Sequence, residues 1–310
     1  MKSIQYDKYG GPELMHLVDV EPPSPGHGQV LVTVRAAAAN PMDWKIRSGA
    51  TKLMTGRHFP RGLGHDFAGT VTAVGEGVTS FRKGDDVLGA MSLKASGAFA
   101  EMVVADETSI VAKPAHLSYE EAAALPTVGV TALQCVVDKG KLHAGQNVFI
   151  NGCLGGVGRA AAQLAIAHGA HVAGSCRSAA AADAEALGIT PVMGFDFDPQ
   201  DLNGQYDLVI DTAATLSLKS ARILLKPHGR FIDINGSPAK MARAVFSRDF
   251  TPLIAKYTPD ALRTVADAAG HGTLTVPIAR TVPLTQAIDA LTTLEHSHTP
   301  KGGRLVIVPQ

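Results

Sequence analysis

Three glycines, Gly152, Gly155 and Gly158, have a spacing that suits a loop for binding phosphate. They follow an apolar run at 148–150 and precede an alanine-rich stretch at 160–165, which predicts the order strand, glycine turn, helix. The first glycine would permit the tight turn, the second would let a pyrophosphate approach the backbone, and the third would let the helix pack closely. Free N–H groups at the helix start would bind the pyrophosphate. The spacing is Gly-x-x-Gly-x-x-Gly rather than the commoner Gly-x-Gly-x-x-Gly, so an ordinary strand–helix turn is the alternative.

The end of the next predicted strand indicates which dinucleotide binds. A carboxylate there would accept hydrogen bonds from a ribose 2′-hydroxyl, whereas a cation and a hydroxyl would hold a 2′-phosphate. Ser175, Arg177 and Ser178 occupy this place, and residues 174–178 contain no acid. The guanidinium of Arg177 can donate to a phosphate, and Ser175 or Ser178 can add one hydroxyl. We therefore expect NADPH rather than NADH; the alternative is that Arg177 is a solvated loop cation.

The composition is that of an ordinary globular chain. It has 310 residues, enough for two domains or one large one. The 28 basic and 28 acidic residues cancel, and there is no basic run of the kind that binds nucleic acid or an anionic membrane. Residues 1–8 lack the apolar core of a signal peptide, and no segment is apolar for long enough to span a bilayer. We expect a soluble, cytoplasmic protein that acts on a small molecule.

The three cysteines, Cys135, Cys153 and Cys176, are widely spaced. They form no Cys-x-x-Cys pair, so neither a disulfide framework nor a cysteine-built zinc site is indicated. We expect small buried thiols.

The first hundred or so residues have the pattern of a β-rich domain. Residues 29–35 and 69–75 alternate between apolar and polar types, and clusters of Pro, Gly and Asp separate such segments. Many short strands without intervening helices predict a small barrel or sandwich.

The pattern becomes helical from about Ser118. Residues 119–125 are predicted to form a helix, with Ser118 as N-cap and Glu121 completing a capping box. A second helix is predicted over 132–138 and should end at Gly140.

Strands and helices then alternate from 147 to about 235, on a scale that predicts right-handed βαβ units and a parallel sheet. We interpret the remaining segments as the chain returning to complete the first domain. The predicted strands are 147–151, 171–176, 206–211, 230–234, 274–281 and 304–308, with a weak one near Val192. The predicted helices are 159–168, 179–187, 217–225, 259–269 and 285–294.

Together with the glycine loop, four other segments carry a resemblance to a known family. Over nearly its whole length the chain resembles the zinc-independent quinone oxidoreductase branch of the medium-chain dehydrogenase/reductases. The segments are Ala-Asn-Pro-Met-Asp-Trp-Lys-Ile-Arg-Ser-Gly at 39–49, Gly-His-Asp-Phe-Ala-Gly-Thr-Val at 64–71, Gly-Val-Thr-Ala-Leu at 129–133 and Lys-Gly-Gly-Arg-Leu-Val-Ile at 301–307.

The resemblance implies an α/β fold with two domains. A GroES-like β-barrel catalytic domain would take 1–117 and 252–310, and an inserted Rossmann domain with a doubly wound parallel sheet would bind NADP at 118–251. The active site would lie between the domains, where Asn40 and Thr131 approach the nicotinamide. Such relatives are commonly dimers or tetramers, and we expect a homodimer. Trp44 also belongs to the predicted site and either covers the cofactor or fills the core. The remaining predicted cofactor-binding residues are Leu154, Gly156, Val157, Ala213 and Gly236.

Zinc enzymes of the same superfamily need three protein ligands and one open coordination position. Their first ligand is a cysteine three residues before an aspartate. Asn40 stands at that place relative to Asp43, and an amide is a poor zinc ligand. His65 matches the second ligand, but the cysteine expected near 125–127 is absent. No metal is therefore expected, and His65 is predicted to have a structural or pocket-lining role.

The expected reaction follows from the missing metal, because no Lewis acid is then available to polarise an alcohol or a ketone. NADPH would deliver hydride to a substrate that already accepts it, a quinone or an α,β-unsaturated carbonyl compound. Asp43 is either a proton donor or a carboxylate that opposes an Arg or Lys in a buried corner. The alternatives are a zinc-type alcohol dehydrogenase and a non-catalytic NADPH-binding protein.

Two positions near the predicted 2′-phosphate site depart from the family pattern. Many relatives place a lysine and a tyrosine after the second strand of the cofactor domain. Here residues 179–182 are all alanine, and Phe195 stands where the tyrosine would be. Arg177 is then expected to carry more of the cofactor preference.

Overall fold

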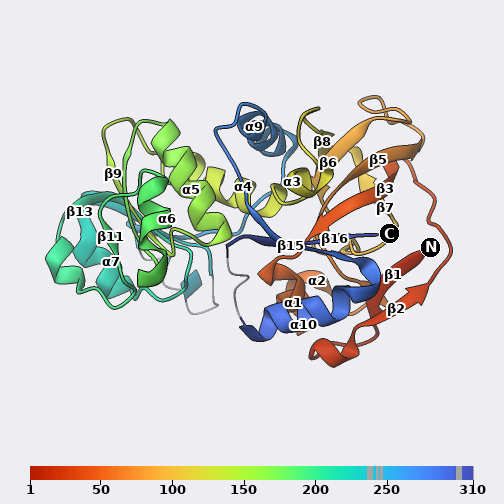
Figure 1. The fold of residues 1–310 in the computed structure, drawn as a ribbon, viewed down its shortest axis with the longest axis horizontal. Helices are drawn as coiled ribbons and strands as arrows, with labels where there is room; N and C mark the ends of the chain where they lie inside the picture. Colours follow the sequence, from red (N-terminus) through yellow and green to blue (C-terminus); the bar gives the residue numbers. More distant parts are fainter. Residues whose placement is uncertain (236–239, 242–243, 245–246, 298–301, 310) are drawn as a thin grey trace. The chain divides into compact units, whose positions relative to one another are not determined.

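The computed structural model describes residues 1–235, 240–241, 244, 247–297 and 302–309. The chain forms two compact units (Figure 1). The first consists of Met1–Thr127, Tyr257–Gly270 and Val276–Gln310, and the second of Val128–Lys256 and His271–Thr275. The C-terminal part of the chain thus returns to the first unit, after the residues that make up most of the second unit.

The larger sheet of the first unit is mainly antiparallel. Its strands run in the order β15-β16-β3-β5-β6-β8, with β7 paired to β3, and β15 and β16 pair in parallel. Alternate residues in the first half of β3 are buried, which explains the alternation of its sequence. The bounds are β3 Gln29–Ala38, β5 Asp66–Val74, β6 Asp86–Ala90, β7 Met102–Asp106, β8 Ile110–Ala112, β15 Ile278–Pro283 and β16 Arg304–Val308. A smaller sheet has the order β2-β1-β4, with β1 Lys2–Tyr6, β2 His16–Asp19 and β4 Arg61–Gly62.

Helices interrupt the β-rich part of the first unit, which the strand-only prediction missed. The local signals are Pro41 in the first turn, where a missing N–H costs nothing, and Asp43, whose Oδ2 accepts from the N–H of Asn40 at 2.7 Å. Arg47 donates to Glu295 at 2.5 Å and so joins α1 to α10, which lie side by side in Figure 1. The helices are α1 Pro41–Arg47, α2 Lys52–Thr55, α3 Tyr119–Ala123, α9 Pro259–Gly270 and α10 Ala287–Ser297, with 3-10 turns η1 Pro12–Leu14, η2 Glu107–Ser109 and η6 Leu284–Gln286.

The predicted capping box at the start of α3 is confirmed. Ser118 Oγ accepts from the N–H of Glu121 at 3.1 Å, and Glu121 Oε2 accepts from the N–H of Ser118 at 2.8 Å. The next helix begins earlier than the predicted range of 132–138. Helix α4 spans Pro126–Leu133 and continues as a wider π-helical turn, η3 Gln134–Lys139. Gly129 and the β-branched residues around it have low helix propensity, which concealed the first turns of α4.

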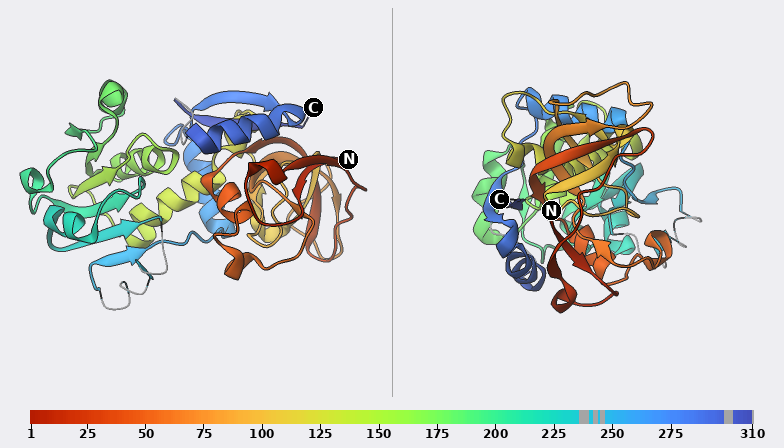
Figure 2. Two further views of the ribbon diagram at one scale, coloured as in Figure 1. Left: turned by 90° about the horizontal axis from the view of Figure 1, so that it is seen from below. Right: turned by 90° about the vertical axis from the view of Figure 1, so that its right-hand side faces the viewer.

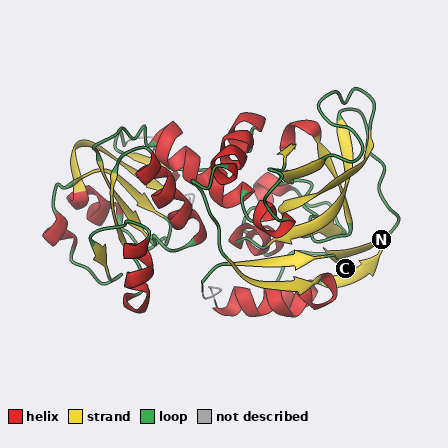
Figure 3. Ribbon diagram, turned by 45° about the horizontal axis from the view of Figure 1, so that its top comes forward, coloured by secondary structure: helices red, strands yellow, loops and turns green. Residues whose placement is uncertain are grey.

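A parallel six-stranded sheet is the centre of the second unit (Figure 3). Its order, β11-β10-β9-β12-β13-β14, places the first strand in the middle and is the doubly wound order. The predicted fold class is confirmed. The strands are β9 Asn147–Asn151, β10 His171–Ser175, β11 Val192–Met193, β12 Tyr206–Asp211, β13 Leu225–Asp233 and β14 Phe250–Pro252. The helices are α5 Gly156–Ala167, α6 Ala181–Ala186 and α7 Leu218–Leu224, with η4 Ser178–Ala180 and η5 Pro199–Leu202.

Most predicted strands and helices of the second unit begin and end within a few residues of the observed ones. The strand predicted over 274–281 is displaced, since β15 begins at Ile278 after an irregular segment that contains Pro277.

No helix in the described ranges is long and apolar enough to cross a bilayer.

Candidate cofactor site and a buried polar cluster

The glycine loop between β9 and α5 has the close backbone packing that its spacing predicts. Gly152 has a φ of +82°, a conformation that favours glycine. A Cβ on Gly158 would lie 2.1 Å from the carbonyl oxygen of Gly152, so α5 can pack on the loop only without a side chain there. At Gly155 the corresponding distance is 3.3 Å, which is less restrictive.

The start of α5 presents backbone donors. Gly155 is the N-cap and supplies no side chain to cap the helix. The first helical bond at this end runs from the N–H of Arg159 to the carbonyl of Gly155 at 2.8 Å. The N–H groups of Gly156, Val157 and Gly158 precede that bond and have no acceptor one turn back within the helix. These donors and the positive end of the helix dipole together favour a bound anion.

Asn151, at the carboxyl end of β9, ties three neighbouring strands together. It pairs in register with Ser175 of β10 on one side and with Asp211 of β12 on the other. Its Nδ2 donates to Asp211 Oδ1 at 2.8 Å and to Thr215 Oγ1 at 2.7 Å, and its Oδ1 accepts from Ser175 Oγ at 2.5 Å. Because the side chain is buried and its amide has partners at both ends, the loop that follows Asn151 starts from a fixed position.

Asp211 extends this network to the loop after β12. Its Oδ1 accepts from the N–H of Ala213 at 3.1 Å and its Oδ2 from the N–H of Leu216 at 3.1 Å. Burial raises the pKa of the Asp211 carboxyl, while its hydrogen bonds to Asn151 and Leu216 act in the opposite direction. Thr212 Oγ1 donates to the carbonyls of Asn151 and Gly152 at 2.8 and 3.0 Å. Ala213, one of the predicted site residues, is therefore held beside the glycine loop.

At the end of β10 the two predicted serines have different surroundings. Ser175 is fully buried, and its hydroxyl donates to Asn151 and accepts from the N–H of Gly152 at 3.3 Å. Arg177 and Ser178 are exposed. A Cβ placed on Gly194 would lie 3.6 Å from Ser178 Oγ and 2.5 Å from Asp196 Oδ1. An acid from the loop after β11 therefore borders the same small space as the Ser178 hydroxyl.

The three cysteines are buried, as predicted. Burial raises the pKa of Cys135, and it raises the pKa of Cys153 to about 12. Cys153 packs under the second strand, where a Cβ on Gly174 would lie 2.7 Å from the Cβ of Cys153. Cys153 fills space beside the glycine loop, and the raised pKa values of Cys135 and Cys153 make these thiols poor nucleophiles.

In the first unit, Asn40 is the centre of a buried polar cluster. Its Nδ2 donates to Asp66 Oδ2 at 2.9 Å and to the carbonyl of Ala38 at 3.2 Å. Its Oδ1 accepts from Nη2 of Arg304, which also donates to the carbonyl of Ala39 at 2.5 Å. The amide oxygen that would have to bind a metal is therefore in contact with a guanidinium cation.

Asp66 joins the Asn40 cluster to the start of α4. Its Oδ1 accepts from Thr127 Oγ1 at 2.7 Å and its Oδ2 from the N–H of Thr127 at 2.9 Å. Tyr257 donates to Thr127 Oγ1 at 3.4 Å and packs edge-on against His65, with 5.2 Å between ring centroids. The cluster thus connects β3, β5, β16 and the first turn of α4.

Two buried carboxyls in this cluster lie in the field of one cation, the half-buried Arg304. Desolvation raises the pKa of Asp43 to about 8, and it raises the pKa of Asp66 to about 6. The positive charge of Arg304 lowers both values, while Asp66 raises that of Asp43. Asp43 is therefore protonated and Asp66 ionised near neutral pH. Asp43 is buried and its Oδ2 accepts from the Asn40 N–H, while Arg304 acts on it through its charge; among the described residues the two side chains form no ion pair.

His65 is fully buried, and neither ring nitrogen has a hydrogen-bond partner among the described residues. Burial lowers its pKa to about 4, so the ring is neutral. Within the described parts of the chain, no group of three His, Cys, Asp or Glu side chains could hold a metal ion. His65, which matches one zinc ligand by sequence, has Tyr257 as its nearest aromatic neighbour instead.

The other predicted site residues are distributed between the two units. Trp44 is half-buried and packs against the core of the first unit. Thr131 is buried in α4, and Leu154 is half-buried in the glycine loop. Gly236 lies outside the described residues.

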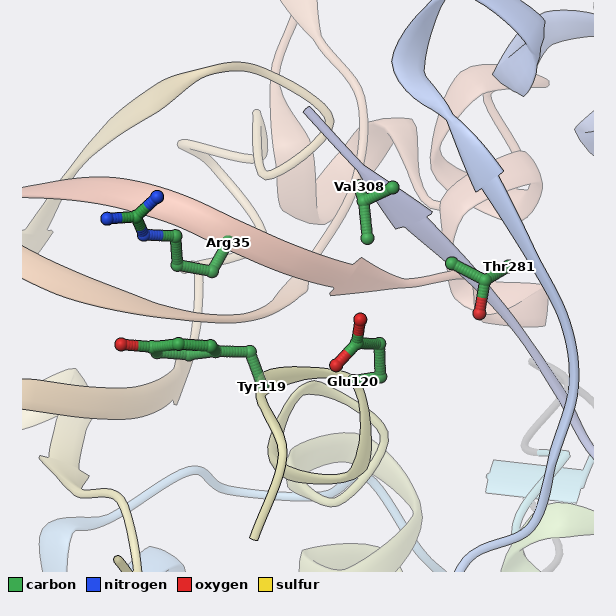
Figure 4. Close-up of a pocket in the computed structure, with 5 residues that line it drawn as sticks. All are labelled: Arg35, Tyr119, Glu120, Thr281 and Val308. Atoms are coloured by element: carbon green, nitrogen blue, oxygen red, sulfur yellow. The ribbon is translucent and has the colours of Figure 1, made fainter. Parts of the chain in front are cut away.

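A separate pocket of about 330 Å³ lies on the first unit (Figure 4). It is lined by Arg35, Tyr119, Glu120, Thr281 and Val308, none of which belongs to the predicted site. Tyr119 is anchored there, because its hydroxyl donates to Asp86 Oδ1 at 2.7 Å. Neither the sequence pattern nor the residues that line this pocket indicate a ligand for it.

Two known families match the chain in separate segments. Residues 26–115 match the alcohol dehydrogenase GroES-like domain, and residues 190–307 match the zinc-binding dehydrogenase family. The chain is 33% identical to a chloroplastic quinone-oxidoreductase of Triphysaria versicolor, over 80% of this chain and 79% of that protein. It is 30% identical to a chloroplastic quinone-oxidoreductase homolog of Spinacia oleracea, over 100% of this chain and 98% of the relative. The chain belongs to the quinone-oxidoreductase-like medium-chain dehydrogenase/reductases.

Solved structures agree with this family. The quinone oxidoreductase from Coxiella burnetii has a TM-score of 0.90 and 31% identity, over 100% of this chain and 99% of that one. The predicted resemblance is therefore confirmed, and the chain is an oxidoreductase of a family that binds a nicotinamide cofactor.

Several residues of this quinone-oxidoreductase-like chain were not predicted to take part in a site. Asp66 and Arg304 lie in family segments that imply no role for them, and the sequence pattern of Asn151 and Asp211 predicts only strand ends. A usable signal was present: each is a polar residue that ends or begins an otherwise apolar strand. In the parallel sheet of the second unit, the carboxyl ends of the strands, where Asn151 and Asp211 stand, gather at one edge, and ligands bind at such edges.

Proposed function

We propose that this chain uses NADPH to reduce a quinone or an α,β-unsaturated carbonyl compound by direct hydride transfer, without a metal ion. The observation that carries the proposal is the contact of Arg304 with Asn40. A catalytic zinc ion needs three protein ligands whose lone pairs point at the metal, and it keeps one coordination position open for substrate. Here Oδ1 of Asn40 accepts from the guanidinium of Arg304, and a second positive charge beside it would be repelled.

The cofactor half of the proposal rests on the loop after β9. The N–H groups of Gly156, Val157 and Gly158 would hold the pyrophosphate, and the amide of Asn151 keeps the loop in place. Arg177 and Ser178 would hold the 2′-phosphate, because both are exposed at the end of β10. When bound, the cofactor supplies a hydride.

One observation favours NADH as a rival cofactor. Asp196 borders the space next to Ser178, and a carboxylate there could accept from ribose hydroxyls. Arg177 is the stronger argument, since a 2′-phosphate would gain charge-assisted hydrogen bonds from it. The choice between the two cofactors is therefore a choice between Arg177 and Asp196 as the residue that contacts the 2′ position.

The substrate half of the proposal rests on the charge of the Asn40 cluster. With Asp43 protonated and Asp66 ionised against Arg304, this part of the barrel is close to neutral. A neutral substrate that is already electron-poor, such as a quinone, suits such a site better than an alcohol that needs a Lewis acid. We assign Thr131 to binding of the nicotinamide and Trp44 to contact with substrate or cofactor, in keeping with the family segments that contain them.

We further propose that the protein acts as a homodimer in the cytoplasm on a small-molecule substrate. Light scattering coupled to size-exclusion chromatography tests the assembly. A monomer at micromolar concentration would contradict the dimer and would leave the proposed reaction untouched.

The reaction is tested by following the loss of NADPH absorbance with a panel of quinones, linear enones and simple ketones. Turnover of quinones or enones after treatment with a chelator is expected. Turnover of alcohols or ketones that requires added zinc would favour a zinc-type alcohol dehydrogenase. Tight NADPH binding with no turnover of any compound would favour a non-catalytic NADPH-binding protein.

A further inference from the structure

An exposed surface with both apolar and basic side chains lies at the end of α2 in the first unit. We name it the α2 tip and define it as Lys52, Leu53, Met54, Arg57, His58 and Lys94. The side chain of Leu53 is 98% exposed and that of Met54 is 44% exposed. Figure 2 shows the orange segment that contains α2 at the periphery of its unit. A leucine exposed to this extent has no packing role in the chain that carries it.

Buried contacts beneath the α2 tip hold it in shape. Arg61 is 6% exposed and donates from Nη2 to the carbonyl of Thr55 at 2.5 Å and to the carbonyl of Lys94 at 3.1 Å. The hydroxyl of Tyr9 donates to the carbonyl of Gly56 and is 3.1 Å from Thr55 Oγ1. Arg61 therefore links α2 to the loop around Lys94, which brings cations from distant parts of the sequence together.

The charge of the α2 tip has one sign. From Trp44 to His65 the sequence contains five basic residues and no acidic one. Two of these, Arg47 and Arg61, are buried and Lys45 is half-buried, which leaves Lys52 and Arg57 exposed. Lys94, whose carbonyl Arg61 also binds, is the third exposed cation of the tip. Among the described residues, none of these three exposed cations forms an ion pair. The sequence shows no basic run here because the cations are spaced along the chain.

We propose that the α2 tip docks on the surface of an anionic lipid bilayer, with Leu53 and Met54 entering the interface and the three cations facing the headgroups. A bilayer accepts one or two apolar side chains with a few cations around them. A stable protein partner would need roughly 800 Å² from each side, more than a four-residue helix and a neighbouring loop supply. A lipid surface therefore fits the tip better than an acidic protein does.

Such docking would bring the enzyme to hydrophobic quinones, which partition into bilayers. That consequence rests on the proposed function, whereas the docking itself does not. The two are separated experimentally by measuring vesicle binding without cofactor or substrate, and reduction of a short-chain quinone without vesicles.

The test is co-sedimentation of the full chain with two kinds of vesicle. One kind is pure phosphatidylcholine, and the other contains one part phosphatidylglycerol to two parts phosphatidylcholine. Binding is expected only to the anionic vesicles and should be released by high salt. Lys52→Gln with Arg57→Gln should lower the partition coefficient about 25-fold, and Leu53→Ser about tenfold. A matched control, Lys83→Gln with Val74→Ser, removes another exposed cation and another exposed apolar side chain from the same unit and should bind like the wild type.

Three results would overturn the proposal. The first is no sedimentation with anionic vesicles at low salt. The second is equal loss of binding in the control variant. The third is a monomer–dimer shift on Leu53→Ser without any vesicle binding, which would assign the tip to contacts between copies of the chain. Circular dichroism and short-chain quinone reduction should match the wild type in all variants.

Discussion

Nη2 of Arg304 donates a hydrogen bond to the amide oxygen of Asn40, within the first unit. The two residues are 264 positions apart in sequence, and β16 brings them together by pairing with β3. The contact places a fixed positive charge against the side chain that stands where zinc enzymes of the superfamily have a cysteine ligand. It also provides the cation for two buried carboxyls, Asp43 and Asp66.

Replacing Arg304 by leucine should destabilise the protein strongly. It leaves two acceptors, Asn40 Oδ1 and the carbonyl of Ala39, without their donor, and removes the positive charge that lowers the pKa of Asp66. Each buried acceptor left unsatisfied costs about 1–3 kcal/mol. Urea unfolding measures the loss, and Arg304→Lys should recover part of it. Arg82→Leu, which removes an exposed arginine, should change stability by less than about 0.5 kcal/mol. Equal losses in the two leucine variants would contradict the role given to Arg304.

Elemental analysis of the wild type should find no stoichiometric zinc.

The raised pKa of Asp43, about 8, makes stability depend on pH. The folded state holds this proton while the unfolded state releases it near pH 4, so Asp43 stabilises the fold fully at low pH. The contribution is lost as the pH rises through 8. Stability should fall by about 1 kcal/mol per pH unit between about pH 5 and pH 7 from this group alone.

Asp43→Asn should make that pH dependence shallower, because the amide does not ionise. Asp66, whose pKa is raised to about 6, still lowers stability as the pH rises toward 6 in the variant. Thermal unfolding of wild type and variant across this range gives the comparison. His65, with its pKa lowered to about 4, acts in the opposite direction and weakens the fold as the pH falls below about 6.5. A variant whose stability follows pH as steeply as the wild type would show that Asp43 is not the group responsible.

Arg177→Ala should weaken NADPH binding about 10- to 100-fold and leave NADH binding unchanged, since charge-assisted hydrogen bonds to the 2′-phosphate are lost. Fluorescence titration with both cofactors measures the change. Lys219→Ala removes another exposed cation of the same unit and serves as the control. If Asp196→Ala instead lowers NADH affinity and Arg177→Ala changes neither cofactor, the preference for NADPH is wrong.

Ser175 and Ser178 should separate into a structural and a cofactor-binding hydroxyl. Ser175→Ala leaves the buried Asn151 Oδ1 without its donor and should cost about 1–3 kcal/mol, with no change in the preference between NADPH and NADH. Ser178→Ala should leave stability unchanged and weaken NADPH binding. Urea unfolding and cofactor titration on both variants test the distinction, which fails if the two variants behave alike.

Gly158 and Gly155 should separate in the same way. A Cβ at position 158 meets the backbone oxygen of Gly152 at 2.1 Å, so Gly158→Ala should lower stability by about 1–3 kcal/mol and weaken cofactor binding. Gly155→Ala meets the same oxygen at 3.3 Å and should weaken cofactor binding with little effect on stability. Unchanged binding in both variants would contradict the assignment of this loop to the pyrophosphate.

The sequence alone determined the features that depend on local order. The glycine loop, the capping box at Ser118 and the alternation of strands and helices are read from neighbouring residues, because turns and amphipathic periods are short-range. The segments shared with the family led to the prediction of two domains and drew attention to Asn40, which stands where zinc enzymes have a cysteine ligand. The helices α1 and α4 were missed or shortened, although Pro41 and Pro126 marked their first turns.

The tertiary structure decided which polar groups meet. Arg304 and Asn40, or Asn151 and Asp211, are far apart in sequence, and only strand pairing shows that each buried group has a partner. It also distinguished the buried Ser175 from the exposed Ser178, which are equivalent in the sequence pattern. Burial and long-range contacts set the pKa values of Asp43 and His65, because desolvation depends on what the whole fold packs around a side chain.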